Sequence, residues 1–191
     1  MTQSPDKEDS HTPFLTFMIA IDGLFAKNKK ESPDNLSLGK GIAQFSLGEE
    51  IAQLMKPILT IKNLLSNKYC QPSDNLFDLP KPYIIKATDD YTIESFVWRP
   101  GQSTSIHDHK CLCVAGVIQG TEVETRYTLH DNYVKMGKTT KMNPGQISIL
   151  NSEDIHSVKN DGDDIAISLH IYAADITKVE TSINNIYELK P

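Results

Sequence analysis

Two histidines placed two positions apart are the residues of this chain best suited to bind a metal ion. They are His107 and His109, in the run Ile106-His-Asp-His109. Successive side chains of a β-strand point to opposite faces, so residues two apart share a face and can approach one ion. Imidazole suits first-row transition metals, and the chain lacks the Cys-x-x-Cys pair typical of structural zinc sites. The alternative interpretation is two histidines on a polar strand face.

A third candidate ligand, His156, follows the turn signal Asn143-Pro-Gly145 in a chain that has only six histidines. Three neutral imidazoles on one side of an ion leave coordination positions open for other molecules. Open positions are typical of catalytic metal sites, whereas the protein fills every position of a structural site. The three histidines therefore predict a mononuclear metal site.

The segment 165–172 alternates strictly between apolar and mixed positions. Ser168, His170 and Tyr172 share one face, together with Ala166. On one strand face they could form a line of hydrogen bonds that ends in a phenol near the metal. The alternative is an edge strand with a wet polar face.

The elements that must position these residues change character along the chain. Apolar residues recur near helical spacing in 14–27 and 38–68, and Pro57 should kink or divide the second run. From Tyr83 onward, short alternating segments are separated by turn signals such as Pro100-Gly101 and Gln119-Gly120. We expect a mainly β protein, with a cupin-type jelly-roll barrel and N-terminal α-helices packed outside it.

Length and composition indicate one domain preceded by a short tail. The 191 residues are 39% hydrophobic, which suits a single core. We expect a mobile tail at 1–12 and one domain at 13–191, divided into a helical part (13–79) and the barrel (80–191). The net charge of −6 argues against nucleic acid or an anionic membrane as a partner.

The cysteines and the apolar segments bear on the compartment. The odd count of three cysteines has no disulfide-framework spacing, which favours a reducing cytoplasm. The apolar segment 14–25 is interrupted by Asp22 and is too short to cross a membrane. We therefore expect a cytoplasmic protein.

The segment from Trp98 to Tyr127 resembles the first cupin motif. That motif has a glycine, five residues, His-x-His, three or four residues, a glutamate ligand, six residues and a second glycine. Its positions correspond here to Gly101, His107, His109, Cys113 and Gly120, so a cysteine replaces the glutamate.

This replacement is one of several features that resemble the cysteine dioxygenase type I family of thiol dioxygenases, which includes mercaptopropionate dioxygenases. The others are Ile-His-Asp-His, the pair His156 and Asn160, and the run Ser168-Leu-His-Ile-Tyr172. The similarity covers roughly residues 80–172, about half of the chain.

The resemblance implies a role for each matching residue. His107, His109 and His156 would hold Fe(II) without a protein carboxylate, and the substrate thiolate would supply the negative charge. The family's relay beside the oxygen site corresponds to Ser168, His170 and Tyr172. Cys113 matches the cysteine that forms a thioether with the relay tyrosine in the animal enzymes, and both a crosslink and a free thiol remain open.

The chain differs from the family at the position of the residue that binds the substrate carboxylate. Family members that bind cysteine use an arginine in a Tyr-x-Arg run before the tryptophan strand, whereas this chain has Tyr83-Ile-Ile-Lys86. The remaining candidates for carboxylate binding are Lys81, Lys86 and Arg126. A lysine offers a point charge without the two-pronged geometry of arginine, so the preferred thiol is expected to differ.

These features together predict a non-heme Fe(II) thiol dioxygenase. Its partners would be O2 and a small thiol, cysteine or a related mercapto acid, and its product would be a sulfinic acid. One alternative is another cupin dioxygenase or isomerase that acts on a carbon substrate, although those families usually carry the glutamate ligand. The other is a non-catalytic metal-binding cupin that senses a small ligand.

Overall fold

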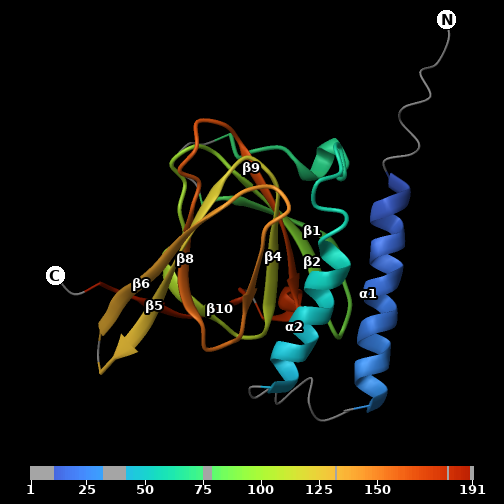
Figure 1. Cartoon of the computed structure of the whole chain (residues 1–191), viewed down its shortest axis with the longest axis horizontal. Coiled ribbons are helices and arrows are strands. Elements are labelled where there is room, and N and C mark those ends of the chain that lie inside the picture. Colours follow the sequence, from blue (N-terminus) through green and yellow to red (C-terminus); the bar gives the residue numbers. More distant parts are fainter. Residues whose placement is uncertain (1–10, 32–41, 75–78, 132, 180, 190–191) are drawn as a thin grey trace, which may run out of the picture.

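The computed structural model describes residues 11–31, 42–74, 79–131, 133–179 and 181–189. Helix α1 spans His11–Glu31 and α2 spans Ile42–Met55. Both run along one side of a β-barrel (Figure 1). Helix α2 ends just before Pro57, as the sequence predicted. Of the expected tail at 1–12, residues 1–10 lie outside the described ranges, and His11 and Thr12 begin α1.

The barrel consists of two antiparallel sheets. The first has the order β1-β2-β9-β4-β7 and the second the order β10-β3-β8-β5-β6. The strands of the first sheet are β1 (Lys81–Ala87), β2 (Thr92–Trp98), β4 (Cys113–Gln119), β7 (Ile147–Leu150) and β9 (Ala166–Tyr172). Those of the second are β3 (Ile106–His109), β5 (Glu122–His130), β6 (Tyr133–Met142), β8 (Ile155–Lys159) and β10 (Ile183–Tyr187). Short 3-10 helices lie at Asn67–Tyr69 and Ile176–Lys178.

The larger apolar core lies between the helices and the outer face of the first sheet. Buried residues of both helices pack there against alternate residues of β2, β4 and β9; among them are Phe17, Ile21, Ile51, Met55, Ile93, Val97, Val114, Ile167, Leu169 and Ile171. Gly116 of β4 lets the end of α2 and the turn after it approach closely, because a Cβ atom there would lie 2.5 Å from Leu59 Cδ1 in that turn and 3.1 Å from Met55 Cε. The helices therefore cover the outside of the barrel, which confirms the predicted fold class.

Strand β9 is central in its sheet and paired on both sides. All of its residues are buried, and β2 and β4 are its neighbours. The alternative of an edge strand with a wet polar face is therefore wrong. The predicted turns are confirmed at Gly101, Gly120 and Gly145, whose positive φ angles of 82°, 71° and 88° favour glycine. None of the described helices has the length and apolarity needed to cross a membrane.

Candidate metal centre

The two sheets bring His107, His109 and His156 together inside the barrel. His107 and His109 share the inner face of β3, and the register of β3 and β8 places His156 directly opposite His107. All three side chains are buried, and one nitrogen from each lies within 4.8 Å of the other two. The Nε2 atoms of His109 and His156 are 3.0 Å apart. Local strand periodicity predicted that the first two histidines share a face. The pairing of β3 with β8 brings the third candidate ligand, His156, next to them.

In two of the histidines, a hydrogen bond at Nδ1 determines the tautomer. It leaves the Nε2 lone pair free to face the site. The Nδ1 atom of His107 lies 2.9 Å from the carbonyl oxygen of Ser105, which can only accept. The Nδ1 atom of His156 lies 3.0 Å from Oε1 of Glu124. Each Nδ1 therefore carries the proton, and each Nε2 presents a lone pair to the site.

The electrostatic surroundings keep His107 and His109 neutral. Burial and the nearby His156 together lower the pKa of His107 to about 4 and that of His109 to about 2. Burial alone would raise the pKa of Glu124, but its hydrogen bond with His156 and the charge of Arg126 outweigh it and lower that pKa. Nitrogen donors from three histidines beside an ionised carboxylate fit a divalent transition metal ion.

A family comparison agrees with this geometry. The model of the family described as "Cysteine dioxygenase type I" matches residues 86–182, just over half of the chain. The chain belongs to the cysteine dioxygenase type I family. The match includes all three histidines and the whole of β9.

Solved structures with the same kind of fold are only distantly similar. A protein with a double-stranded β-helix domain from Klebsiella pneumoniae is 22% identical, over 66% of this chain and 98% of its own, with a TM-score of 0.48. Peruvianin-I, described as a cysteine peptidase from Thevetia peruviana latex, is 18% identical over 66% of this chain and 77% of its own, with a TM-score of 0.50. A cupin superfamily protein from Desulfitobacterium hafniense is 19% identical over 50% and 77%, with a TM-score of 0.40.

Strand β9 of this cysteine dioxygenase family member carries a line of hydrogen bonds. The indole nitrogen of Trp98 donates to Ser168 Oγ over 3.0 Å, and Ser168 Oγ lies 2.9 Å from Nε2 of His170. Because the Ser168 oxygen already accepts from Trp98, its own proton can be donated to His170. Burial lowers the pKa of His170 to about 3, so this ring is neutral.

The line continues from His170 toward Cys113, where the sequence had led us to expect Tyr172. The Nδ1 atom of His170 lies 3.8 Å from Sγ of Cys113. Tyr172 is stacked beside His170, with ring centroids 6.1 Å apart, and its ring is 5.8 Å from that of His109. The phenol therefore lies close to the histidine cluster, as predicted, but beside the line.

Cys113 and Tyr172 form a buried pair. The register of β4 and β9 places them directly opposite each other, and the phenol lies within hydrogen-bonding reach of the thiol. Cys113 forms no disulfide with the other cysteines, and burial raises the pKa of both Cys113 and Tyr172 well above the usual range. At neutral pH both groups keep their protons.

The three basic residues considered for carboxylate binding lie in different places. Lys81 and Lys86 pair in register with Val97 and Ile93, which face the helices, so both lysines are on the outer face of the sheet. The ammonium group of Lys86 is 2.6 Å from Asp22 of α1. The bulge between Ile84 and Lys86 puts Lys86 on the outer face, whereas Lys81 lies there by the regular register. This placement does not support a substrate role for either lysine.

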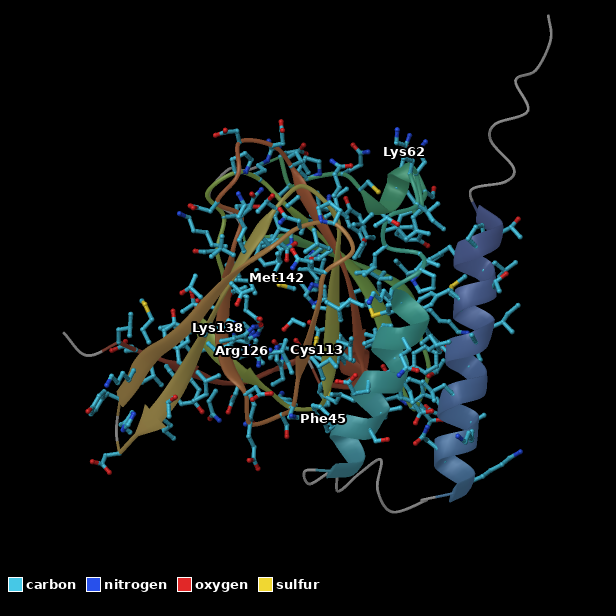
Figure 2. The ribbon with its side chains drawn as sticks, viewed as in Figure 1. Phe45, Lys62, Cys113, Arg126, Lys138 and Met142 are labelled. Carbon is cyan, nitrogen blue, oxygen red and sulfur yellow. The ribbon has the colours of Figure 1, made fainter. Side chains whose placement is uncertain are left out.

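Arg126 does lie beside the site. It is opposite His156 in register, inside the outline of the barrel with Cys113 (Figure 2). Its guanidinium group is 3.2 Å from Glu124 and 3.4 Å from Asp154, and it donates to Ser148 Oγ over 2.7 Å. These partners already occupy most of the guanidinium donors, which leaves few for a substrate carboxylate. The ion pair with Arg126 instead holds Glu124 in place.

Three buried glutamates of the barrel interior were missed at the level of sequence. They are Glu94, Glu122 and Glu124, each less than a tenth exposed. Glu122 and Glu124 line a cavity of about 20 Å³, enough for one water molecule, together with His156 and His170. The available signal was a single charged residue within the largely apolar strand β2 for Glu94, and charged residues at every second position at the start of β5 for Glu122 and Glu124.

Proposed function

We propose that this protein is a non-heme Fe(II) thiol dioxygenase. It would add both atoms of O2 to the sulfur of a small thiol, cysteine or a related molecule, and release the sulfinic acid. The observation that carries the proposal is a set of three converging histidines, with no carboxylate among the grouped ligands of the described residues, in a member of the cysteine dioxygenase type I family. A thiolate substrate supplies the missing negative charge.

Atoms and electrons balance without another cofactor. The sulfur forms two bonds to oxygen, the O–O bond breaks, and the thiol provides the electrons that reduce O2. Bound iron supplies the one-electron chemistry that a thiol and O2 lack by themselves. No nicotinamide, flavin or oxoacid is consumed.

The protein's own residues position the metal ligands and hold protons. Glu124 orients His156 through the 3.0 Å hydrogen bond to Nδ1, and Arg126 keeps that carboxylate ionised. Tyr172 keeps its proton because burial raises its pKa, so it can donate a hydrogen bond beside the histidines. Ser168 and Trp98 hold His170 in one tautomer.

Packed apolar groups around Cys113 and Tyr172 keep water out of this part of the barrel. The cluster also contains Leu150 and Ile176, with Phe96 packed against it. Water exclusion strengthens hydrogen bonds to the reacting groups and limits side reactions of a bound oxidant. A thioether between Cys113 and Tyr172 is part of the proposal: an S–C bond would replace the thiol S–H bond and one ring C–H bond, with O2 as the acceptor of the two electrons and two protons. Intact-mass measurement would report it as the loss of two hydrogen atoms.

The test is oxygen consumption with defined thiols. Protein loaded with Fe(II) under anaerobic conditions is given cysteine, 3-mercaptopropionate or cysteamine and then exposed to O2. We expect oxygen uptake equimolar with sulfinate, measured by electrode and mass spectrometry. The His156→Ala variant should lose activity with its metal, while His130→Ala, which changes an exposed histidine of the β5–β6 hairpin, should keep both.

The other outcomes separate the alternatives. Thiol binding without oxygen uptake would support a ligand-sensing cupin. Oxygen uptake with a carbon substrate and no sulfinate would support another cupin dioxygenase. The proposed partners are therefore a small thiol and O2, and the proposed compartment is the cytoplasm, because the three cysteines are free.

A further inference from the structure

A buried acid lies on the inner face of β2. Glu94 is 5% exposed. Its neighbours Ile93 and Val97 pack against the helices, whereas Phe96, two positions from Glu94, packs with the interior clusters around Tyr172 and Trp98. Strand alternation therefore directs the Glu94 side chain into the barrel.

Glu94 borders the proposed reaction space. It pairs in register with His170, which places the two Cβ atoms about 5 Å apart, and Tyr172 is its diagonal neighbour. Its charge acts on both Tyr172 and Cys113, since it contributes to the raised pKa of each. The Tyr172 ring in turn is 5.8 Å from that of His109.

Within the described part of the chain, no hydrogen bond or ion pair reaches the Glu94 carboxyl group. Burial alone raises its pKa to about 7. Glu124 makes a clear contrast, because it is similarly buried yet contacts His156, Ser148 and Arg126. A buried carboxylate without a partner is destabilised, and a cation that entered the barrel would stabilise the ionised form of Glu94.

The strand next to Glu94 offers nothing to a substrate carboxylate. Its register partner on β1 is Ile84, and the next residue on the same face is Pro82; both are exposed to solvent and neither carries a charge. The lysines of β1 face outward, as described above, and Arg126 is already held by Glu124 and Asp154. None of these described residues beside Glu94 provides a free cation for a substrate carboxylate.

We propose that Glu94 binds the ammonium group of the substrate, so that the preferred substrate is a short aminothiol without a carboxylate. This inference rests on the proposed function, because it assumes that a thiol enters the histidine site. The ammonium ion would donate hydrogen bonds to the Glu94 carboxylate while the sulfur faces the histidines. A carboxylate in the same position would be repelled.

The test is anaerobic thiol binding to the cobalt(II)-substituted protein, in which bound thiolate adds near-ultraviolet absorption. Three probes are titrated: cysteamine, ethanethiol and 3-mercaptopropionate. The wild type is compared with Glu94→Gln, which keeps the size of the side chain, and with Glu122→Gln. The latter is a matched control, because Glu122 is also buried in the interior and burial also raises its pKa to about 7.

The decisive quantity is the ratio of the dissociation constants of ethanethiol and cysteamine. Cysteamine has the more acidic thiol, and that advantage is common to all three proteins. We expect Glu94→Gln to reduce the ratio about tenfold, the size of a charge-assisted hydrogen bond, and Glu122→Gln to leave it unchanged. We also expect 3-mercaptopropionate to bind more tightly to Glu94→Gln than to the wild type.

Two results would overturn the inference, and they can be told apart. Equal ratios in the wild type and Glu94→Gln, with thiols bound, would mean that Glu94 does not recognise the amine, and the proposed function would stand. If no thiol alters the cobalt spectrum of the wild type, the proposed function itself is wrong and the inference is lost with it. The wild-type titrations can be interpreted even if Glu94→Gln does not fold.

Discussion

The Glu94→Gln substitution should change how the stability of the metal-free protein depends on pH. Burial raises the pKa of Glu94 from 4.5 to about 7 in the folded protein. Below pH 4.5 both the folded and the unfolded chain are protonated at this position. Between the two pKa values the folded protein keeps a proton that the unfolded chain releases, so stability falls as pH rises. Above pH 7 the loss is complete.

The size of this loss follows from the two pKa values. Each pKa unit corresponds to 1.36 kcal/mol, so a rise from 4.5 to about 7 predicts a loss of about 3 kcal/mol. Glutamine does not titrate, so the variant lacks this loss. The free energy of unfolding of Glu94→Gln, measured relative to that of the wild type, should therefore rise by about 3 kcal/mol as the pH is raised from acidic to slightly alkaline.

Urea unfolding at about pH 4 and about pH 8, monitored by circular dichroism, measures the difference directly. Other titrating groups, including Glu122, contribute equally to both proteins and cancel in the comparison. The reasoning would be refuted if the two proteins differed by the same free energy at both pH values. That result would mean that Glu94 is ionised in the folded state and already has a cationic partner.

Three further predictions concern the metal ligands, the relay and the packing of the helices. Glu124→Gln should weaken metal binding about 10- to 100-fold, because His156 would lose the hydrogen bond that orients it. Competition with a chelator measures this affinity, and an unchanged value would mean that Glu124 does not position His156. Tyr172→Phe should lower turnover about 100-fold or more at unchanged metal content, and equal loss of both would argue against a proton-holding role. Gly116→Ala should cost about 1–3 kcal/mol of unfolding free energy, because the new methyl group meets Leu59, and an unchanged urea midpoint would contradict that packing.

Local patterns were enough to predict several parts of this protein. A period of two placed His107 and His109 on one face, and the same period separated the apolar and relay sides of β9. The stop before Pro57 and the glycine turns follow from restrictions on single residues. His156 and the polar face of Ser168, His170 and Tyr172 were also proposed from the residues, and the family resemblance assigned them roles. The three histidines converge, and Ser168 contacts His170, whereas Tyr172 lies beside that line.

The sequence alone determined which side chains share a strand face, because alternation depends only on neighbouring residues. Tertiary structure decided which face is the inside, since that depends on strand order, bulges and where the helices pack. A bulge in β1 placed Lys86 against Asp22, pairing of β5 with β8 brought Glu124 to His156, and barrel closure buried Glu94. Such contacts join residues far apart in the chain, so no local period could reveal them.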